Sequence, residues 1–261
     1  MNRLDTTLSR LRAARKSGLV CYFTAGDPDY AASLSLLQGL AGAGADIIEL
    51  GLPFSDPVAD GPVIQAAHLR ARAAGQTTAR TLEMVQALRQ TDADTPVVLM
   101  GYLNPVMQYG MERFMGDAAV AGVDALLLVD LPVEHAQAAR AAARAAGLHL
   151  ISMTAPTSDD ARLKQVLADA RGFVYHVTLN GTTGVQQCTA KAVDQAVTRL
   201  RAQTTLPLAV GFGIREAAQV RALACVADLI VIGSKLVETL AAQGREAALR
   251  EVRVFAEALG G

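Results

Sequence analysis

The stretch AGADIIEL, residues 43–50, ends a helix-forming segment and begins an apolar run, and AGVDALLLV, residues 121–129, repeats this order. A related copy, AGLHL, occupies residues 146–150. The glycine of each copy can adopt the left-handed backbone conformation that ends a helix. Each glycine is followed by a short apolar run without polar alternation, which is typical of a parallel strand buried on both faces. The motif therefore predicts three places where a helix leads into a buried strand.

Eight such apolar runs occur along the chain. They cover residues 19–23, 47–50, 97–100, 125–129, 148–153, 173–177, 206–210 and 229–232. Ala-rich and Leu-rich segments with helical spacing separate them, for example at 31–43, 78–89, 134–146 and 190–202. Regular alternation of strand and helix indicates an α/β fold with a parallel sheet. We expect a single (β/α)8 TIM barrel domain, residues 1–261, with an extra amphipathic helix at the N-terminus.

The prolines favour the same topology. Seven of the nine follow an apolar run and two precede one, so loops with a restricted backbone gather at one end of the expected sheet. In a β/α barrel the C-terminal ends of the strands carry the active site. A doubly wound open sheet is the competing fold, but its dinucleotide-binding glycine fingerprint is missing.

Composition narrows the class of protein. Of 261 residues, 51% are hydrophobic and 19% are charged, with a formal net charge of −1. This balance excludes a disordered chain and disfavours electrostatic binding to nucleic acid or acidic membranes. The N-terminal segment lacks the apolar stretch of a secretory signal, and no run approaches the roughly 18 residues of a membrane span. Cys21, Cys188 and Cys225 show no paired spacing, so we expect no disulfide framework, no zinc site and a cytoplasmic location.

Two acidic residues are candidates for catalysis. Glu49 lies inside the apolar run at 47–50, where burial raises a carboxyl pKa and keeps a proton available near neutral pH. The alternative is a glutamate that pairs with an arginine or caps a loop. Asp60 and Asp56 follow, and position alone does not decide which aspartate faces the cavity, because an aspartate before Gly-Pro is commonly a turn or cap residue. Two acids in different environments could divide the work, one donating a proton and the other staying ionised.

Glycine-rich loops follow the last two apolar runs. They read GFGIR, residues 211–215, and GSK, residues 233–235, and each is expected to open a helix. In β/α barrels the loops after strands seven and eight often bind phosphate through backbone N–H groups at a helix N-terminus. The alternative is that these glycines only form tight turns. Arg215 and Lys235 are expected to be solvated residues at helix starts.

The remaining polar residues suggest no further chemistry. We expect surface or packing roles for His68, His135 and His149, and for His176 with a pocket position as its alternative. The sequence contains no nucleophile with an adjacent base, no metal-ligand cluster and no Walker motif, so we expect no metal. The long connections at 51–77, with an extra helix at 63–73, and at 178–189 lie on the expected active-site side.

The sequence resembles the α subunit of tryptophan synthase over nearly its whole length. The resemblance rests on YFTAGDP, residues 22–28, on ELGLPFSDPVADGP, residues 49–62, and on GTTG, residues 181–184, followed by the two phosphate loops. That family consists of β/α barrels that cleave indole-3-glycerol phosphate to indole and D-glyceraldehyde 3-phosphate by a retro-aldol reaction without a cofactor. The resemblance therefore implies a lyase of tryptophan biosynthesis.

The resemblance also implies roles for individual residues. Glu49 would protonate the indole carbon that bears the glycerol chain and help to deprotonate the side-chain hydroxyl, while Asp60 would bind the indole N–H and stabilise the cationic intermediate. The residues implied for substrate and phosphate are Gly184, Gly211, Phe212, Gly213, Gly233 and Ser234. Those implied for the indole pocket and its loop are Tyr22, Met100, Tyr102, Leu127, Val129, Met153, Tyr175 and Thr183. Thr183 would orient Asp60 when its loop closes over substrate.

A partner is implied as well. The family works as an α2β2 heterotetramer in which indole passes through a tunnel to a β subunit, and the pyridoxal phosphate would reside only on that subunit. The loop with Asp56 and Pro57 and the loops at 104–105 and Pro132 would face it. Many relatives have a basic residue before the glycine of the sixth loop, where this chain has Thr178-Leu179-Asn180-Gly181, so loop closure and communication with the partner can differ.

Three alternatives remain open. A stand-alone indole-releasing lyase would have the same site and no partner. A non-catalytic allosteric subunit would have no need of the acid pair at Glu49 and Asp60. A sugar-phosphate isomerase of the histidine-pathway type would use aspartates at the ends of strands one and five, where this chain has Thr24 and Met153-Thr154.

Overall fold

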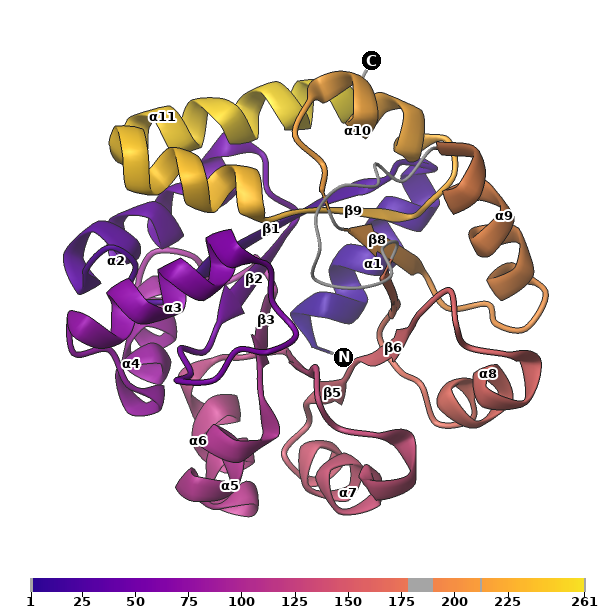
Figure 1. Ribbon diagram of the computed structural model, residues 1–261, viewed down its shortest axis with the longest axis horizontal. Helices are drawn as coiled ribbons and strands as arrows, with labels where there is room; N and C mark the ends of the chain where they lie inside the picture. Colours follow the sequence, from indigo (N-terminus) through magenta and orange to yellow (C-terminus); the bar gives the residue numbers. More distant parts are fainter. Residues whose placement is uncertain (1, 178–189, 212, 261) are drawn as a thin grey trace.

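The structure is a computed structural model and describes residues 2–177, 190–211 and 213–260. Its strands are parallel and form one curved sheet around a central axis (Figure 1). The strands are β1 (Gly18–Thr24), β2 (Ile47–Gly51), β3 (Val97–Gly101), β4 (Ala125–Leu128), β5 (His149–Leu150), β6 (Ser152–Thr154), β7 (Val174–Val177), β8 (Leu208–Gly211) and β9 (Leu229–Ile232). Their order is β5-β4-β3-β2-β1-β9-β8-β7-β6, so β1 pairs with both β2 and β9.

The sheet closes through its fifth strand, which is divided in two. β5 pairs with β4, β6 pairs with β7, and only Ile151 separates β5 from β6. The Ile151 N–H still donates to the carbonyl oxygen of Leu126 at 2.7 Å, so the chain remains beside β4 as it changes neighbours. The eight-stranded α/β barrel is confirmed, with the correction that the run at 148–153 forms two short strands instead of one.

Helices follow the strands and surround the sheet (Figure 1). They are α2 (Tyr30–Gly39), α3 (Pro62–Ala73), α4 (Thr78–Arg89), α5 (Leu103–Tyr109), α6 (Met111–Ala121), α7 (Gln137–Ala145), α8 (Asp160–Leu167), α9 (Ala190–Arg201), α10 (Ala217–Ala224) and α11 (Ser234–Gly260), with short 3-10 helices η1 (Ala41–Ala43) and η2 (Val133–His135). The extra helix expected at 63–73 is confirmed as α3. Within the described residues no helix is both long and apolar enough to cross a membrane.

One helix contradicts the sequence analysis. Asn104 and Pro105, expected in a loop, lie in the first turn of α5. Proline is tolerated there because the first N–H groups of a helix have no intrahelical partner. The loop expected at this place is therefore a short helix.

The inner core of the barrel is closed at one end by α1 (Arg3–Ala14). Leu4, Leu8 and Leu11 of this helix pack against inward-facing strand residues such as Val20 and Val98. In Figure 1, α1 lies at the centre of the ring formed by the other helices. The expected N-terminal helix is thus a plug for the N-terminal end of the barrel, which leaves the C-terminal ends of the strands as the open mouth.

The repeated motif that precedes β2 and β4 holds neighbouring strands together. Its glycines, Gly44 and Gly122, have φ of 106° and 96°, as the sequence predicts for helix ends. Its aspartates each accept a backbone N–H from an adjacent strand or its start: Asp46 from Leu19 at 3.0 Å, and Asp124 from Val97 at 2.9 Å.

The fourth residue of each motif copy, Asp46, Asp124 or His149, also contacts α1. The pairs are Arg10 with Asp46 at 2.7 Å, Arg3 with Asp124 at 3.2 Å, and Asp5 with His149 at 2.9 Å. Arg89 of α4 makes a second ion pair with Asp124 at 3.1 Å, and the Asp124 side chain is only 1% exposed. The motif thus ends a helix, joins two strands and docks α1.

Candidate active site

Glu49 lies on β2 beside Tyr22 of β1 and Val98 of β3. It is two residues after Ile47 of the inner core, so its side chain faces the inside of the barrel toward the mouth. The residue is 2% exposed, and neither carboxyl oxygen has a hydrogen-bond partner among the described residues. Burial, and then the negative charge of Asp60, raises the pKa of Glu49 from 4.5 to about 8. The carboxyl group is therefore mostly protonated at neutral pH.

Asp60 is held by the loop between β2 and α3 and is 5% exposed. Its Oδ2 accepts a hydrogen bond from the Tyr102 hydroxyl at 2.8 Å, and the Nε2 atom of His68 lies 3.4 Å from the same oxygen. Asp56, in contrast, is exposed. Of the two aspartates that the sequence left undecided, Asp60 is the one that faces the interior.

Tyr102 links Asp60 to its own loop. Its hydroxyl oxygen accepts the Ala59 N–H at 3.0 Å while donating to Asp60, and its ring packs on Phe54 with centroids 5.1 Å apart. Burial, and then the charge of Asp60, raises the pKa of the Tyr102 phenol, so the hydroxyl keeps the proton that it donates. Tyr102 therefore supports Asp60 besides standing near the expected pocket.

His68 is the residue that sequence reasoning missed. We expected a surface or packing role, but its side chain is buried and lies beside Asp60. A signal was present, because His68 shares the buried face of α3 with Ile64, Ala67 and Ala71 at helical spacing. A histidine on an apolar face needs polar partners, and here it finds them in the loop before α3.

The expected indole-pocket residues converge on the inner face of the sheet. Leu127 and Tyr175 belong to the inner core, and Met100, Val129 and Met153 are partly buried against it. Met100 pairs in register with Leu127, and Met153 with Tyr175, so these side chains lie on the inner face as two pairs of neighbours. The structure brings together an apolar wall and two acids at the same end of the barrel.

The side chains of Tyr22 and Tyr175 occupy space that is free only because their neighbours are glycines. A Cβ atom on Gly51 would lie 2.5 Å from the Tyr22 hydroxyl oxygen, and one on Gly211 would lie 2.6 Å from that of Tyr175. A Cβ on Gly233 would approach the Tyr22 ring at 3.2 Å. These contacts show why the strands end in glycine at the mouth, a role that sequence analysis did not assign to Gly51.

The two glycine-rich loops lie at the mouth but differ in form. Ser234 is the first residue of α11, directly after Gly233, so this loop opens a helix as expected. The loop after β8 does not, because Gly213 has a φ of 78° and α10 begins only at Ala217. Arg215 is therefore a loop residue and not a helix-start residue.

Both cations of these loops have carboxylate partners. Arg215 pairs with Glu238, and Lys235 lies 3.8 Å from Glu251. These pairs leave the backbone as the more available group for an anion at the two loops.

Several expected residues lie outside the part of the chain that the structure describes. They are Phe212, Thr178, Leu179, Asn180, Gly181, Thr183, Gly184 and Cys188. Within the described part, Cys21 is buried, Cys225 is exposed, both are free thiols, and no group of three or more potential metal-binding side chains occurs.

The other histidines lie away from the two acids. The Nδ1 atom of buried His176 is 3.0 Å from the Thr154 hydroxyl oxygen, and burial lowers its pKa. It alternates with Tyr175 on β7, so its side chain points away from the barrel interior. His135 is exposed, and His149 pairs with Asp5. The packing role expected for His176 agrees with this position.

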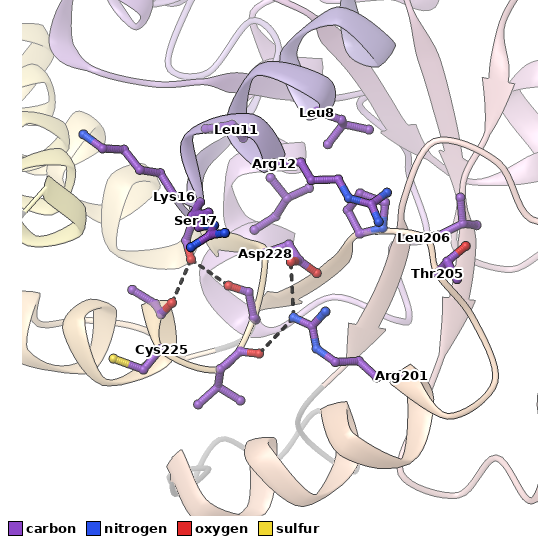
Figure 2. Close-up of a pocket in the computed structure, with 16 residues that line it drawn as sticks. Leu8, Leu11, Arg12, Lys16, Ser17, Arg201, Thr205, Leu206, Cys225 and Asp228 are labelled. Carbon is purple, nitrogen blue, oxygen red and sulfur yellow. Dashed lines mark hydrogen bonds and ion pairs between the residues drawn. The ribbon is translucent and has the colours of Figure 1, made fainter.

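A pocket of about 280 Å³ lies at the opposite end of the barrel, between α1 and the segments that lead into β8 and β9 (Figure 2). Its single carboxylate, that of Asp228, is paired with Arg201 at 3.2 Å, and the Lys16 ammonium group points away from Arg201. The Ser17 hydroxyl is committed to the carbonyl oxygens of Ala224 and Ala227. This pocket lacks the acid pair and apolar wall found at the mouth, so it is not the candidate active site.

Comparison with known proteins agrees with this geometry. A family model described as tryptophan synthase alpha chain matches residues 8–260. A crystal structure of tryptophan synthase subunit alpha from Legionella pneumophila is 38% identical, with a TM-score of 0.92, covering 100% of this chain and 99% of that one. A chain of Mycobacterium tuberculosis tryptophan synthase is 35% identical, with a TM-score of 0.92 and coverage of 99% and 98%. These similarities extend over the whole barrel, including the mouth.

Proposed function

The chain belongs to the tryptophan synthase alpha chain family, whose members are lyases that cleave indole-3-glycerol phosphate, and we propose that Glu49 and Asp60 carry out this cleavage here. The observation that carries the proposal is the buried Glu49 carboxyl group, which has no hydrogen-bond partner among the described residues and a pKa raised to about 8, together with Asp60, which Tyr102 holds by a hydrogen bond. A buried acid without partners costs free energy, and a function in proton transfer explains why it is retained.

The first step is protonation of the ring. Neutral Glu49 donates its proton to the indole carbon that carries the glycerol phosphate chain, and the ring nitrogen becomes positively charged. The apolar wall formed by Leu127 and its neighbours suits the flat indole ring and keeps water from competing for the proton.

The second step breaks the carbon–carbon bond. The Glu49 carboxylate left by the first step removes the proton of the hydroxyl group next to the ring. The electron pair of the broken bond returns to the ring and neutralises its nitrogen, while the former carbinol carbon becomes the aldehyde of D-glyceraldehyde 3-phosphate. One residue thus serves as acid and then as base, and each proton transfer is typically worth 10² to 10⁴ in rate.

Asp60 stabilises the intermediate. Its carboxylate would accept a hydrogen bond from the indole N–H, and that interaction strengthens as the ring becomes cationic. The two acids differ as the chemistry requires, because Glu49 has no hydrogen-bond partner in the described part of the chain and holds a proton, whereas Asp60 accepts a hydrogen bond from a neutral tyrosine.

We assign the phosphate of the substrate to the loops after β8 and β9. The N–H groups of the first turn of α11, from Ser234 onward, have no intrahelical acceptor and suit an anion. Gly211 and Gly213 are included in the proposed site because the family resemblance implies them. Gly184, Phe212 and Thr183 complete the proposed site from outside the described residues.

A β subunit is the proposed partner, in an α2β2 assembly that uses the indole for L-tryptophan synthesis in the cytoplasm. Pyridoxal phosphate would be held by that subunit, with no cofactor on this chain. The loop of Asp56 and Pro57, together with α5 and Pro132, forms the proposed contact surface. Val58 and Met107 on these segments are 75% and 60% exposed, so both apolar side chains are accessible to a partner. The family match disfavours a stand-alone lyase and a non-catalytic subunit.

The experiment that tests this function is indole release from indole-3-glycerol phosphate by the purified chain, with and without a tryptophan synthase β subunit. We expect slow release alone and a large increase with the β subunit. Fast release that ignores the β subunit would favour the stand-alone lyase, and no release under either condition would refute the assigned reaction.

A further inference from the structure

We propose that His68 is a positioning residue for Asp60, a neutral imidazole with its proton on Nε2 that fixes which carboxylate oxygen faces the substrate. The inference rests on the proposed role of Asp60 and extends it to a residue outside the strands and glycine loops of the mouth.

Backbone geometry determines the tautomer of His68. The Phe54 N–H donates to His68 Nδ1 at 3.0 Å, and a backbone N–H cannot accept a hydrogen bond. Nδ1 therefore carries no proton, and in the neutral ring the proton lies on Nε2. Nε2 lies 3.4 Å from Asp60 Oδ2, which is longer than an ordinary N–H···O hydrogen bond, so the imidazole makes a weaker polar contact with this carboxylate. The imidazole thus connects the beginning of the segment 54–60 to its end.

The Tyr102 hydroxyl and the His68 imidazole then face the same oxygen of Asp60. Oδ2 accepts from the Tyr102 hydroxyl at 2.8 Å and faces His68, whereas Oδ1 accepts no hydrogen bond from the described residues. Rotation of the carboxylate would break the Tyr102 bond and move Oδ2 away from His68. The arrangement holds Oδ2 in place and presents Oδ1 for the indole N–H.

The support for His68 is itself rigid. His68, Asp60 and Tyr102 are 2%, 5% and 2% exposed, so water does not replace their contacts. Two residues further along α3, Arg70 binds the buried Asp27 through both carboxylate oxygens, at 2.7 and 2.8 Å. This bidentate pair fixes α3 against the loop after β1. His68 therefore reaches Asp60 from an anchored helix.

A matched pair of variants separates positioning from simple packing. In His68→Asn the shorter amide can still accept the Phe54 N–H but does not reach Asp60. In His68→Gln the amide nitrogen can occupy the place of Nε2 and donate to Asp60. We expect His68→Asn to lower kcat for indole release about three- to tenfold with KM changed less than about twofold, and His68→Gln to restore most of the loss.

Two results would overturn the proposal. Wild-type kcat in both variants would mean that His68 does not act on Asp60, and equal losses in both would mean that it only packs. The assay includes wild type and Asp60→Asn, because failure of wild type to cleave, or full activity of Asp60→Asn, would refute the proposed function itself.

A spectroscopic measurement tests the tautomer without reference to turnover. Nitrogen-15 NMR of the histidine-labelled chain, with the His68 signals assigned by their loss in His68→Asn, should show an unprotonated Nδ1 and a protonated Nε2. A proton on Nδ1, or an imidazolium at neutral pH, would contradict the proposal.

Discussion

Glu49 combines burial with the absence of any hydrogen-bond partner in the described residues, and this combination sets its expected pH behaviour. With a pKa of about 8, the free enzyme holds the proton for ring protonation below that pH and loses it above. We expect kcat/KM to fall by about tenfold for each pH unit above 8. A steady-state pH profile measures this, and a decline that begins near pH 4.5 would show that the titrating carboxyl group has an unshifted pKa, which contradicts the raised pKa of Glu49.

At the same scale, the burial of Glu49 was predictable from sequence, whereas the contact between His68 and Asp60 was not. An acidic residue inside an apolar run at a strand end is unusual wherever the chain folds, so its burial follows from local sequence alone. The link between His68 and Asp60 depends on how the loop after β2 folds back on α3, and no local pattern specifies that path. The choice of Asp60 over Asp56 required the structure for the same reason.

At the scale of elements, the repeated motif before β2 and β4 predicts unequal effects of matched substitutions. Asp124 is 1% exposed and pairs with two arginines, whereas Asp46 is 21% exposed and its partner Arg10 is 60% exposed. Asparagine preserves an acceptor for the strand N–H in both cases, so each change mainly removes charge pairing. We expect Asp124→Asn to lower the free energy of unfolding by about 3 kcal/mol and Asp46→Asn by about 1 kcal/mol or less.

Urea unfolding of the two variants checks this prediction. Equal losses would show that the buried ion pairs on Asp124 contribute no more to stability than the exposed ion pair on Asp46. A larger loss in Asp46→Asn would refute the assigned order of the two sites.

The elements that sequence did not predict have physical explanations. Asn104-Pro105 is typical of a turn, and only the position of Pro105 in the first helical turn makes α5 compatible with it. The division of the run at 148–153 into β5 and β6 comes from the need to pair with β4 on one side and β7 on the other. Regular alternation of apolar runs and helices was sufficient for the other strands and for the barrel.

For the whole molecule, the buried Glu49 lowers the free energy of unfolding at neutral pH. The pKa of Glu49 is raised on folding, so the folded state favours its protonated form. That contribution is fully present below the unfolded value of 4.5 and is lost as pH rises toward 8, because the unfolded chain ionises while the folded protein retains the proton. Glutamine cannot ionise, so we expect Glu49→Gln to be more stable than wild type at pH 7 by up to about 3 kcal/mol.

Unfolding curves at about pH 4, 7 and 9 measure this difference. The free energies of unfolding of the two proteins should converge at about pH 4. A constant difference at all three pH values would mean that packing, and not ionisation, distinguishes them.

The residues that close the barrel and the residues proposed for catalysis lie at opposite ends of the molecule. α1 and the aspartates of the motif close the N-terminal end, while the acids, the apolar wall and the glycine loops occupy the mouth. The sequence predicted this polarity from the position of its prolines. That the chain folds as one domain, and that it meets a β subunit through α5 and the Asp56 loop, stay predictions.

The most direct test of the central claim compares indole release from indole-3-glycerol phosphate by wild type and Glu49→Gln, with substrate binding measured in parallel. If Glu49 supplies and then removes the proton, the variant loses about 10³-fold or more in rate and still binds the substrate. Cleavage by the variant at a rate near that of wild type would contradict the account.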